Sequence, residues 1–251
     1  MSELTFTRDE MMTVAAARSL QNGMSCFVGV GKPSLAANLA RRLHAPDLRL
    51  IYESGPIGAK PTRIPLSIGD GELAATADLV VSVPEMFNYW LQSGRIDVGF
   101  LGAAEIDKFG NINTTVVGDY DHPKTRLPGA GGAPEIAANV GEVVVIVKHS
   151  KRALVDRVGF ITSFGNGRGP GDRAALGLRG AGPTCLITDL GILRPNPDTV
   201  EFELAEIHPG VALDEVLANT GWPLQVSSSL STTVAPTESD LVALRALESV
   251  R

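Results

Sequence analysis

The chain has 251 residues, an apolar content of 44% and a formal net charge of −6. This length is enough for one large α/β domain or two small ones, and the apolar content supports a sizeable core. The charges form no long block of one sign and no apolar run approaches about 18 residues, which excludes a nucleic-acid-binding surface and a membrane-spanning helix.

The cysteines and histidines give no sign of a metal site. Cys26 and Cys185 both lie in apolar runs, which is typical of buried small side chains in a reducing compartment rather than of a disulfide. The histidines are far apart in the sequence. The first residues are polar and acidic, unlike a secretory signal. We therefore expect a cytoplasmic protein without a bound metal.

The predicted elements begin with a helix near the start of the chain. Thr7 and Glu10 have the spacing of a capping box, and Gly23 would end the helix. Beyond it, short apolar runs alternate with helical stretches. Strands are expected at residues 25–30, 48–52, 78–83, 96–101, 142–147, 184–189 and 200–207, and helices near 33–44, 84–93, 213–219 and 239–248. This alternation indicates an α/β fold with an open, mostly parallel sheet flanked by helices, in a single domain covering residues 1–251.

Two long stretches interrupt this rhythm. Residues 107–137 are rich in Gly, Asn, Asp and Pro, and residues 163–182 are crowded with glycine and arginine. Long irregular segments inside compact domains are usually functional. The serine run Ser227–Ser229 is expected to be a polar loop.

The sequence does not match the common phosphate-binding and nucleophile motifs. The segment GVGKPS resembles a P-loop, but Cys26 stands at the first glycine position and Pro33 follows the lysine. The dinucleotide fingerprint fails because its sixth position is Ser34 or Pro134, and a G-x-S-x-G elbow does not occur.

Glu53 is the first candidate for chemistry. It ends the apolar segment LRLIYE and precedes Ser54 and Gly55. Ligands of open parallel sheets bind beyond the carboxyl ends of the strands, where an acid, base or nucleophile would lie. The alternative is a carboxylate solvated at an ordinary turn.

The second candidate is the segment RLPGAGGAPEIAANVG. It places Gly129, Ala130, Gly131 and Gly132 between Arg126 and a probable helix start. Glycines let the backbone approach a ligand, and successive N–H groups can hold a developing oxyanion or a thioester carbonyl. A tight connecting loop is the alternative. Asn113 lies in the preceding loop, where turn hydrogen bonds are the alternative to ligand binding.

The ordered motifs GVGKP, YESG with Pro-Ile-Gly, GAAEIDKFGNIN, RLPGAGGA and HPGVALDEVLANTG carry a family resemblance. Together they resemble the β subunits of class I coenzyme A transferases of the glutaconate CoA-transferase type. More narrowly, RLPGAGGAPEIA and the overall likeness resemble the IpdB branch, the β subunits of steroid-ring hydrolases.

The resemblance implies a NagB/RpiA/CoA-transferase-like fold and a homologous α subunit, as an α2β2 heterotetramer. The active site would lie between the subunits and take a CoA thioester, with no other cofactor. In the transferases a β-subunit glutamate attacks the thioester, a role that would fall on Glu53. Gly129 to Gly132 and Asn113 would contact the substrate or CoA. The 3-oxoacid branch has E-N-G and a phenylalanine where this chain has Glu53-Ser54-Gly55 and Ala133, which argues against direct 3-oxoacid transfer.

Three functions follow from these residues. The first is hydrolytic opening of a carbocyclic ring in a CoA thioester during steroid catabolism, with Glu53 orienting water or acting as base. The second is true CoA transfer, with Glu53 as nucleophile. The third is a non-catalytic structural subunit. In the first two, Arg126 would pair with a substrate carboxylate through two parallel hydrogen bonds.

Overall fold

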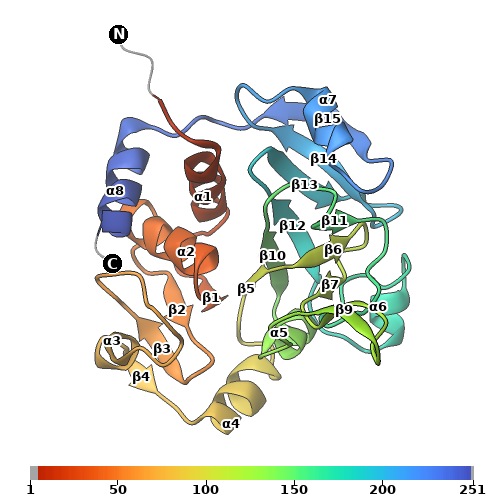
Figure 1. Ribbon diagram of the computed structural model, residues 1–251. Helices are drawn as coiled ribbons and strands as arrows, with labels where there is room; N and C mark the ends of the chain where they lie inside the picture. Colours follow the sequence, from red (N-terminus) through yellow and green to blue (C-terminus); the bar gives the residue numbers. More distant parts are fainter. Residues whose placement is uncertain (1–4, 250–251) are drawn as a thin grey trace.

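The computed structural model describes residues 5–249, and a ten-stranded sheet runs through it (Figure 1). The strands of this sheet are β1 (Ser25–Val28), β2 (Arg49–Ile51), β3 (Pro56–Ala59), β4 (Leu79–Val80), β5 (Val98–Gly102), β10 (Glu142–Ile146), β12 (Pro183–Ile187), β13 (Gly191–Pro195), β14 (Phe202–Ile207) and β15 (Gln225–Thr232). Their order in space is β15-β14-β13-β12-β10-β5-β1-β2-β3-β4.

The centre of the sheet is parallel and both sides change direction. Strands β12, β10, β5, β1 and β2 pair in parallel, whereas β3, β4 and β13 pair antiparallel with their neighbours. β15 returns to a parallel pairing with β14. The predicted α/β fold with a mostly parallel sheet is therefore confirmed.

Helices cover both faces of the sheet. The helices α1 (Arg8–Arg18), α2 (Lys32–Leu43) and α8 (Glu238–Ser249) pack together on one face (Figure 1). The other core contains side chains of α5 (Ala133–Asn139) and α7 (Leu213–Ala218) and of the segment after α4 (Val83–Glu85). The short helices α3 (Gly71–Ala75) and α6 (Asp172–Ala175) lie in connections.

The sequence of β1 shows how the strands serve both cores. Cys26 and Val28 belong to the core beneath α1 and α2, and Phe27 between them belongs to the opposite core. Successive side chains of a strand point to opposite faces, so a strand covered on both sides is apolar throughout. Both cysteines are buried free thiols, as expected.

The first helix begins as its sequence predicts. The Thr7 side chain accepts a hydrogen bond from the Glu10 N–H at 3.1 Å, and the Glu10 carboxylate accepts one from the Thr7 N–H at 2.7 Å. Each side chain thus satisfies a backbone donor that the helix itself leaves unpaired.

Several predicted elements have a different form. The helix expected at 84–93 is the single turn of α4 followed by a π-helix at Met86–Leu91. The serine run expected to be a loop is part of β15, an edge strand whose side chains are mostly polar and exposed. The stretch 107–137 and its surroundings contain the short strands β6 (Glu105–Asp107), β7 (Ile112–Asn113), β8 (Val116–Gly118), β9 (Pro123–Arg126) and β11 (Leu154–Val155).

Candidate active site

Glu53 lies in the tight turn between β2 and β3. The strand ends at Ile51, one residue before the end of the strand expected at 48–52. Glu53 and Ser54 are the central residues of a turn closed by the Gly55 N–H to the Tyr52 carbonyl at 3.0 Å. Because β2 is one of the parallel strands, Glu53 stands just beyond the carboxyl end of the parallel sheet. The position expected for it is confirmed.

The two ends of this turn are held by buried neighbours. Tyr52 is fully buried, and its hydroxyl lies 3.3 Å from the Ser34 hydroxyl. Gly55 has φ +115°, and a Cβ there would meet the Val81 carbonyl oxygen at 2.0 Å. Only glycine fits at the end of the turn, for both conformational and steric reasons.

The glycine-rich loop leads into α5. Gly129 and Gly131 have φ values of +107° and +49°, backbone conformations that glycine adopts without strain. Ala130 and Gly131 are exposed, whereas Gly132 is buried and is the residue immediately before α5. The loop therefore has an open part and a buried part.

Glu53 and Gly132 meet at the buried part of this loop. The Gly132 N–H donates a hydrogen bond to Glu53 Oε2 across 3.2 Å. A Cβ at position 132 would lie 2.7 Å from the same oxygen, so a larger residue would displace the carboxylate. The structure thus brings together two features that are separate candidates in the sequence.

A second glycine brings α5 close enough for this contact. Gly99 lies in β5, and a Cβ there would come within 2.5 Å of Ile136 and 3.2 Å of Val140. The missing side chain allows α5 to pack directly on the sheet, which fixes the height of Gly132 above the strand ends.

Phe87 lies beside Gly132, as the Glu53 carboxylate does. A Cβ at Gly132 would meet the Phe87 ring at 2.9 Å, and the ring packs edge to face on Phe27, with centroids 6.2 Å apart. Phe87 belongs to the π-helix, an element that often occurs at functional sites. Phe87 is not among the residues predicted from the sequence, because a single aromatic in a helical stretch is indistinguishable from a core residue.

Asn113 is buried behind the glycine loop. Its amide nitrogen donates to Glu105 Oε2 and to the Val116 carbonyl, each at 2.7 Å, and its oxygen accepts from the Thr115 and Val116 N–H groups. The same segment holds the loop, since the Gly129 N–H donates to the Thr114 carbonyl at 2.8 Å. These bonds give Asn113 a supporting role, and its contact with CoA stays a prediction.

Arg126 ends β9 and is exposed. Its guanidinium donates to the Tyr120 carbonyl at 2.8 Å and lies over the Tyr120 ring, 4.9 Å from the centroid. Its hydrogen bond within the hairpin leaves further donors on the guanidinium for a ligand. A substrate role for Arg126 stays a prediction.

Other buried polar groups are engaged in holding the fold. Asp107 accepts bonds from Asn111 and from the Phe109 and Val158 N–H groups, and burial raises its pKa. Asn111 in turn bonds Gly165 and Gly167. These side chains therefore bond both within their own loop and to residues more than fifty positions away.

The described part of the chain offers neither a metal cluster nor a membrane-spanning helix. Within residues 5–249 no three His, Cys, Asp or Glu side chains gather to hold a metal ion. No helix there combines the length and apolar character needed to cross a membrane.

Comparison with known proteins decides the family. The model of the coenzyme A transferase family matches residues 9–219, most of the chain. The chain belongs to the coenzyme A transferase family. It is a β-type enzyme subunit, similar to the β subunit of the 3-oxoadipate CoA-transferase of Pseudomonas knackmussii, with 61% identity over 244 residues, 97% of this chain and 94% of the relative.

Solved structures of the CoA transferase family agree with this assignment. The glutaconate coenzyme A-transferase of Acidaminococcus fermentans superposes with a TM-score of 0.90 at 35% identity, covering 96% of this chain and 94% of the other. The fold expected from the resemblance is confirmed.

The narrower resemblance to the steroid-ring hydrolases is distant. The cholesterol ring-cleaving hydrolase IpdB subunit of Mycobacterium tuberculosis is 23% identical over 255 residues, covering 96% of this chain and 94% of the relative. The relatives at 61% and 37% identity are named as CoA-transferase subunits and give no support to a role in steroid or cholesterol catabolism.

Proposed function

We propose that this chain is the β subunit of a CoA transferase that acts on a 3-oxo dicarboxylic acid such as 3-oxoadipate. The observation that carries the proposal is the 61% identity, over nearly the full length of both chains, to the β subunit of a 3-oxoadipate CoA-transferase. The contact between Glu53 and Gly132 supports it, because a carboxylate held by a backbone N–H at a strand end suits nucleophilic catalysis.

In this proposal Glu53 is the nucleophile. Its carboxylate attacks the thioester carbonyl carbon, the C–S bond breaks, and an acyl-glutamyl anhydride forms as CoA leaves as a thiolate. The thiolate then attacks the glutamyl carbonyl, which releases the donor acid and leaves a glutamyl-CoA thioester. The acceptor carboxylate repeats these steps in reverse and leaves as its CoA thioester.

The glycine-rich loop would stabilise the charge that develops in these steps. In the resting site the Gly132 N–H holds the Glu53 oxygen at 3.2 Å. Each attack on a carbonyl places negative charge on oxygen, and the N–H groups of the exposed residues Ala130 and Gly131 would supply donors for it. The role of Arg126 would be to bind the distal carboxylate of the acid.

A homologous α subunit would complete the site. The relatives are named as single subunits of larger CoA-transferases, and the α2β2 assembly inferred from the family resemblance belongs to this proposal. The departure from E-N-G at Glu53-Ser54-Gly55 argued against 3-oxoacids. The proposal rests instead on the 61% identity to a relative that is itself named for a 3-oxoacid.

The experiment compares transfer with hydrolysis in the purified pair of subunits. The pair is given succinyl-CoA with 3-oxoadipate, and also succinyl-CoA in buffer without an acceptor. A transferase forms 3-oxoadipyl-CoA and shows ping-pong kinetics, with little CoA released when no acceptor is present. Rapid release of CoA without an acceptor would favour hydrolysis instead.

A further inference from the structure

The orientation of the turn at Glu53 is a separate requirement of the site. Glu53 and Ser54 are the two central residues of the turn, and turns with the same ends differ in the direction of their middle peptide. Tyr52 and Gly55 fix only the ends. Some further contact must select the orientation in which the Glu53 carboxylate reaches the Gly132 N–H.

Ser54 makes such a contact. Its hydroxyl donates a hydrogen bond to the backbone carbonyl of Ile68, which is fourteen positions away in the connection between β3 and α3. Because the bond comes from the second central residue, it ties the middle of the turn to the loop of residues 60–70. We call this segment the bracing loop.

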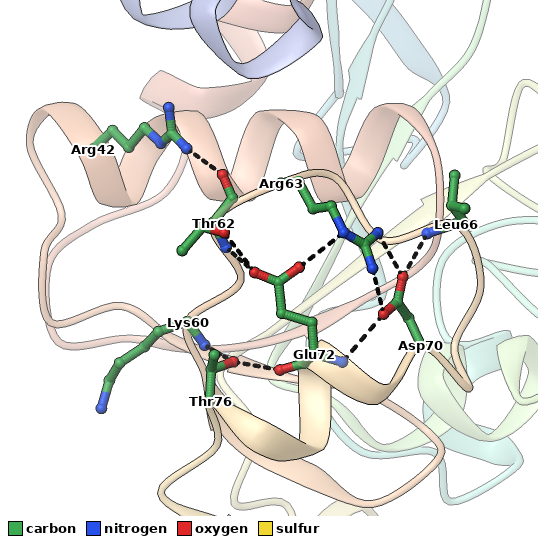
Figure 2. Close-up of polar contacts among 8 residues, drawn as sticks. All are labelled: Arg42, Lys60, Thr62, Arg63, Leu66, Asp70, Glu72 and Thr76. Atoms are coloured by element: carbon green, nitrogen blue, oxygen red, sulfur yellow. Dashed lines mark hydrogen bonds and ion pairs between the residues drawn. The ribbon is translucent and has the colours of Figure 1, made fainter. Parts of the chain in front are cut away.

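A cluster of charged side chains anchors the bracing loop (Figure 2). Arg63 donates two parallel hydrogen bonds to Asp70, at 2.8 and 2.9 Å, and its Nε lies 3.3 Å from Glu72. Glu72 accepts from the N–H and the hydroxyl of Thr62, at 2.6 and 2.7 Å. Asp70 also accepts from the Leu66 N–H at 3.2 Å.

This cluster is more than a loose surface pair. The Asp70 side chain is only 8% exposed. The guanidinium of Arg63 donates one hydrogen bond to each oxygen of the Asp70 carboxylate, a geometry that is stronger than a single contact. The hydrogen bonds from Arg63 lower the pKa of Asp70, and those from Thr62 lower the pKa of Glu72, so both groups hold the loop as anions. Ile68 lies between Leu66 and Asp70, two points that the cluster fixes.

We propose that Ser54 is a positioning residue: its bond to Ile68, in a loop anchored by Arg63, Asp70 and Glu72, orients the turn so that Glu53 points at Gly132. The inference rests on the proposed function in that Glu53 is the reacting group. In this inference Ser54 acts on the orientation of Glu53 and does not contact the substrate.

The test uses the complex of both subunits with Ser54→Ala, Ser54→Thr and Arg63→Gln in this chain. Ser54→Ala removes the hydroxyl and is expected to lower kcat about 10- to 100-fold, the scale of a small misplacement of a reacting group. KM is expected to stay within about twofold, since Ser54 does not bind substrate. Ser54→Thr keeps the donor and is expected to restore most of kcat, and Arg63→Gln is expected to give a smaller loss of the same kind.

The matched control is Lys60→Gln. Lys60 lies at the start of the bracing loop and pairs with the exposed Asp78, outside the contacts that reach Ser54. This variant is expected to keep the kcat of the unchanged complex. A loss equal to that of Arg63→Gln would mean that any disturbance of the loop matters, and would overturn the assigned path.

A crystal structure of the Ser54→Ala complex separates this inference from the proposed function. We expect the Glu53 carboxylate to leave the Gly132 N–H in that variant and to return to it in Ser54→Thr. Unchanged kcat in Ser54→Ala, or a Glu53–Gly132 bond that persists in it, overturns the inference. If the unchanged complex transfers no CoA, the proposed function fails, and the position of Glu53 in the two crystal structures still decides the role of Ser54.

Discussion

Glu53 and Gly132 are 79 positions apart and are joined by one hydrogen bond. The carboxylate comes from a turn beyond β2, and the N–H comes from the residue before α5. Each was recognisable in the sequence by its surroundings, a strand end in one case and a glycine cluster in the other. Their contact was not, because it depends on how closely α5 packs on Gly99.

Replacement of Gly132 by alanine tests the contact without a change of charge. The new Cβ would meet Glu53 Oε2 at 2.7 Å and the Phe87 ring at 2.9 Å. Both are ends of movable side chains, so we expect the fold to persist while kcat falls about 100-fold, as for a misplaced reacting group. The melting temperature and kcat of the complex are the measurements.

Gly159→Ala is the control for that variant. Gly159 has open space around it and no left-handed backbone, so an added methyl group meets nothing. Wild-type activity is expected for it. If Gly132→Ala unfolds the protein, Gly132 is required for the fold. If the variant is folded and its kcat is unchanged, the contact between Gly132 and Glu53 is not needed for catalysis.

Arg126→Lys tests the proposed substrate anchor. Lysine keeps the charge but lacks the planar fork. We therefore expect kcat/KM for a dicarboxylic acid to fall by an amount that corresponds to a loss of roughly 1.5–3 kcal/mol in transition-state stabilisation. The loss should be smaller for an analogue that lacks the distal carboxylate. Arg157→Lys, another exposed arginine, is the control. Equal losses with both acids would mean that Arg126 acts through its contacts with Tyr120.

At the scale of the elements, the parallel centre of the sheet was predictable, as were β4 and β14 nearer its margins, whereas β3, β13 and β15 were not. The runs at β1, β5, β10 and β12 are apolar because they are covered on both faces. β3 is the short segment Pro56–Ala59 with a proline and a glycine, and β13 follows β12 after a tight turn. Such strands are formed by pairing with a neighbour and carry no strong pattern of their own.

Side-chain hydrogen bonds explain why the stretch 107–137 looked irregular. Its strands are two to four residues long and are held by buried groups such as Asp107, Asn111 and Asn113. Polar residues that build a folded segment resemble those of a solvated loop in composition. Ser54 likewise looks like an ordinary turn residue in the sequence. Its partner is the backbone carbonyl of Ile68, and because every residue has such a carbonyl, the sequence cannot identify the partner.

A buried histidine joins three elements and makes the fold sensitive to acid. His149 follows β10, and its ring nitrogens lie 3.0 Å from the Thr188 hydroxyl and 2.9 Å from the Thr220 hydroxyl. Burial lowers the pKa of His149 from 6.5 to about 4. His149 therefore binds a proton below about pH 6.5 in the unfolded chain but only below about pH 4 in the folded chain.

We expect the free energy of unfolding to fall as the pH drops from 6.5 towards 4. His149 would contribute about 3 kcal/mol to this loss, at about 1.4 kcal/mol per pKa unit. Urea unfolding at several pH values measures it. His149→Gln is expected to be less stable at about pH 7.5 but to show a flatter dependence on pH. The control is His122→Gln, at a side chain that is 92% exposed. If His149→Gln keeps the full pH dependence, other groups cause it.

At the scale of the whole molecule, the chain is expected to need a partner. In the proposed function Glu53 would supply the nucleophile and the glycine loop the backbone donors, and the relatives are named as single subunits of larger enzymes. We expect the purified chain to have little or no activity and to gain it on mixing with its α subunit. Light scattering on the active complex gives the stoichiometry, for which we expect α2β2. Full turnover by the isolated chain would contradict this.

The most direct test of the whole account is to trap the CoA thioester on Glu53. The complex is incubated with an acyl-CoA and no acceptor, reduced with borohydride, digested and examined by mass spectrometry. We predict reduction of the Glu53 side chain to an alcohol with parallel loss of activity, no such product in Glu53→Gln, and a kcat at least about 100-fold lower in that variant. Transfer at the normal rate by Glu53→Gln, or an unmodified Glu53 in a complex that transfers CoA and survives borohydride, would contradict it.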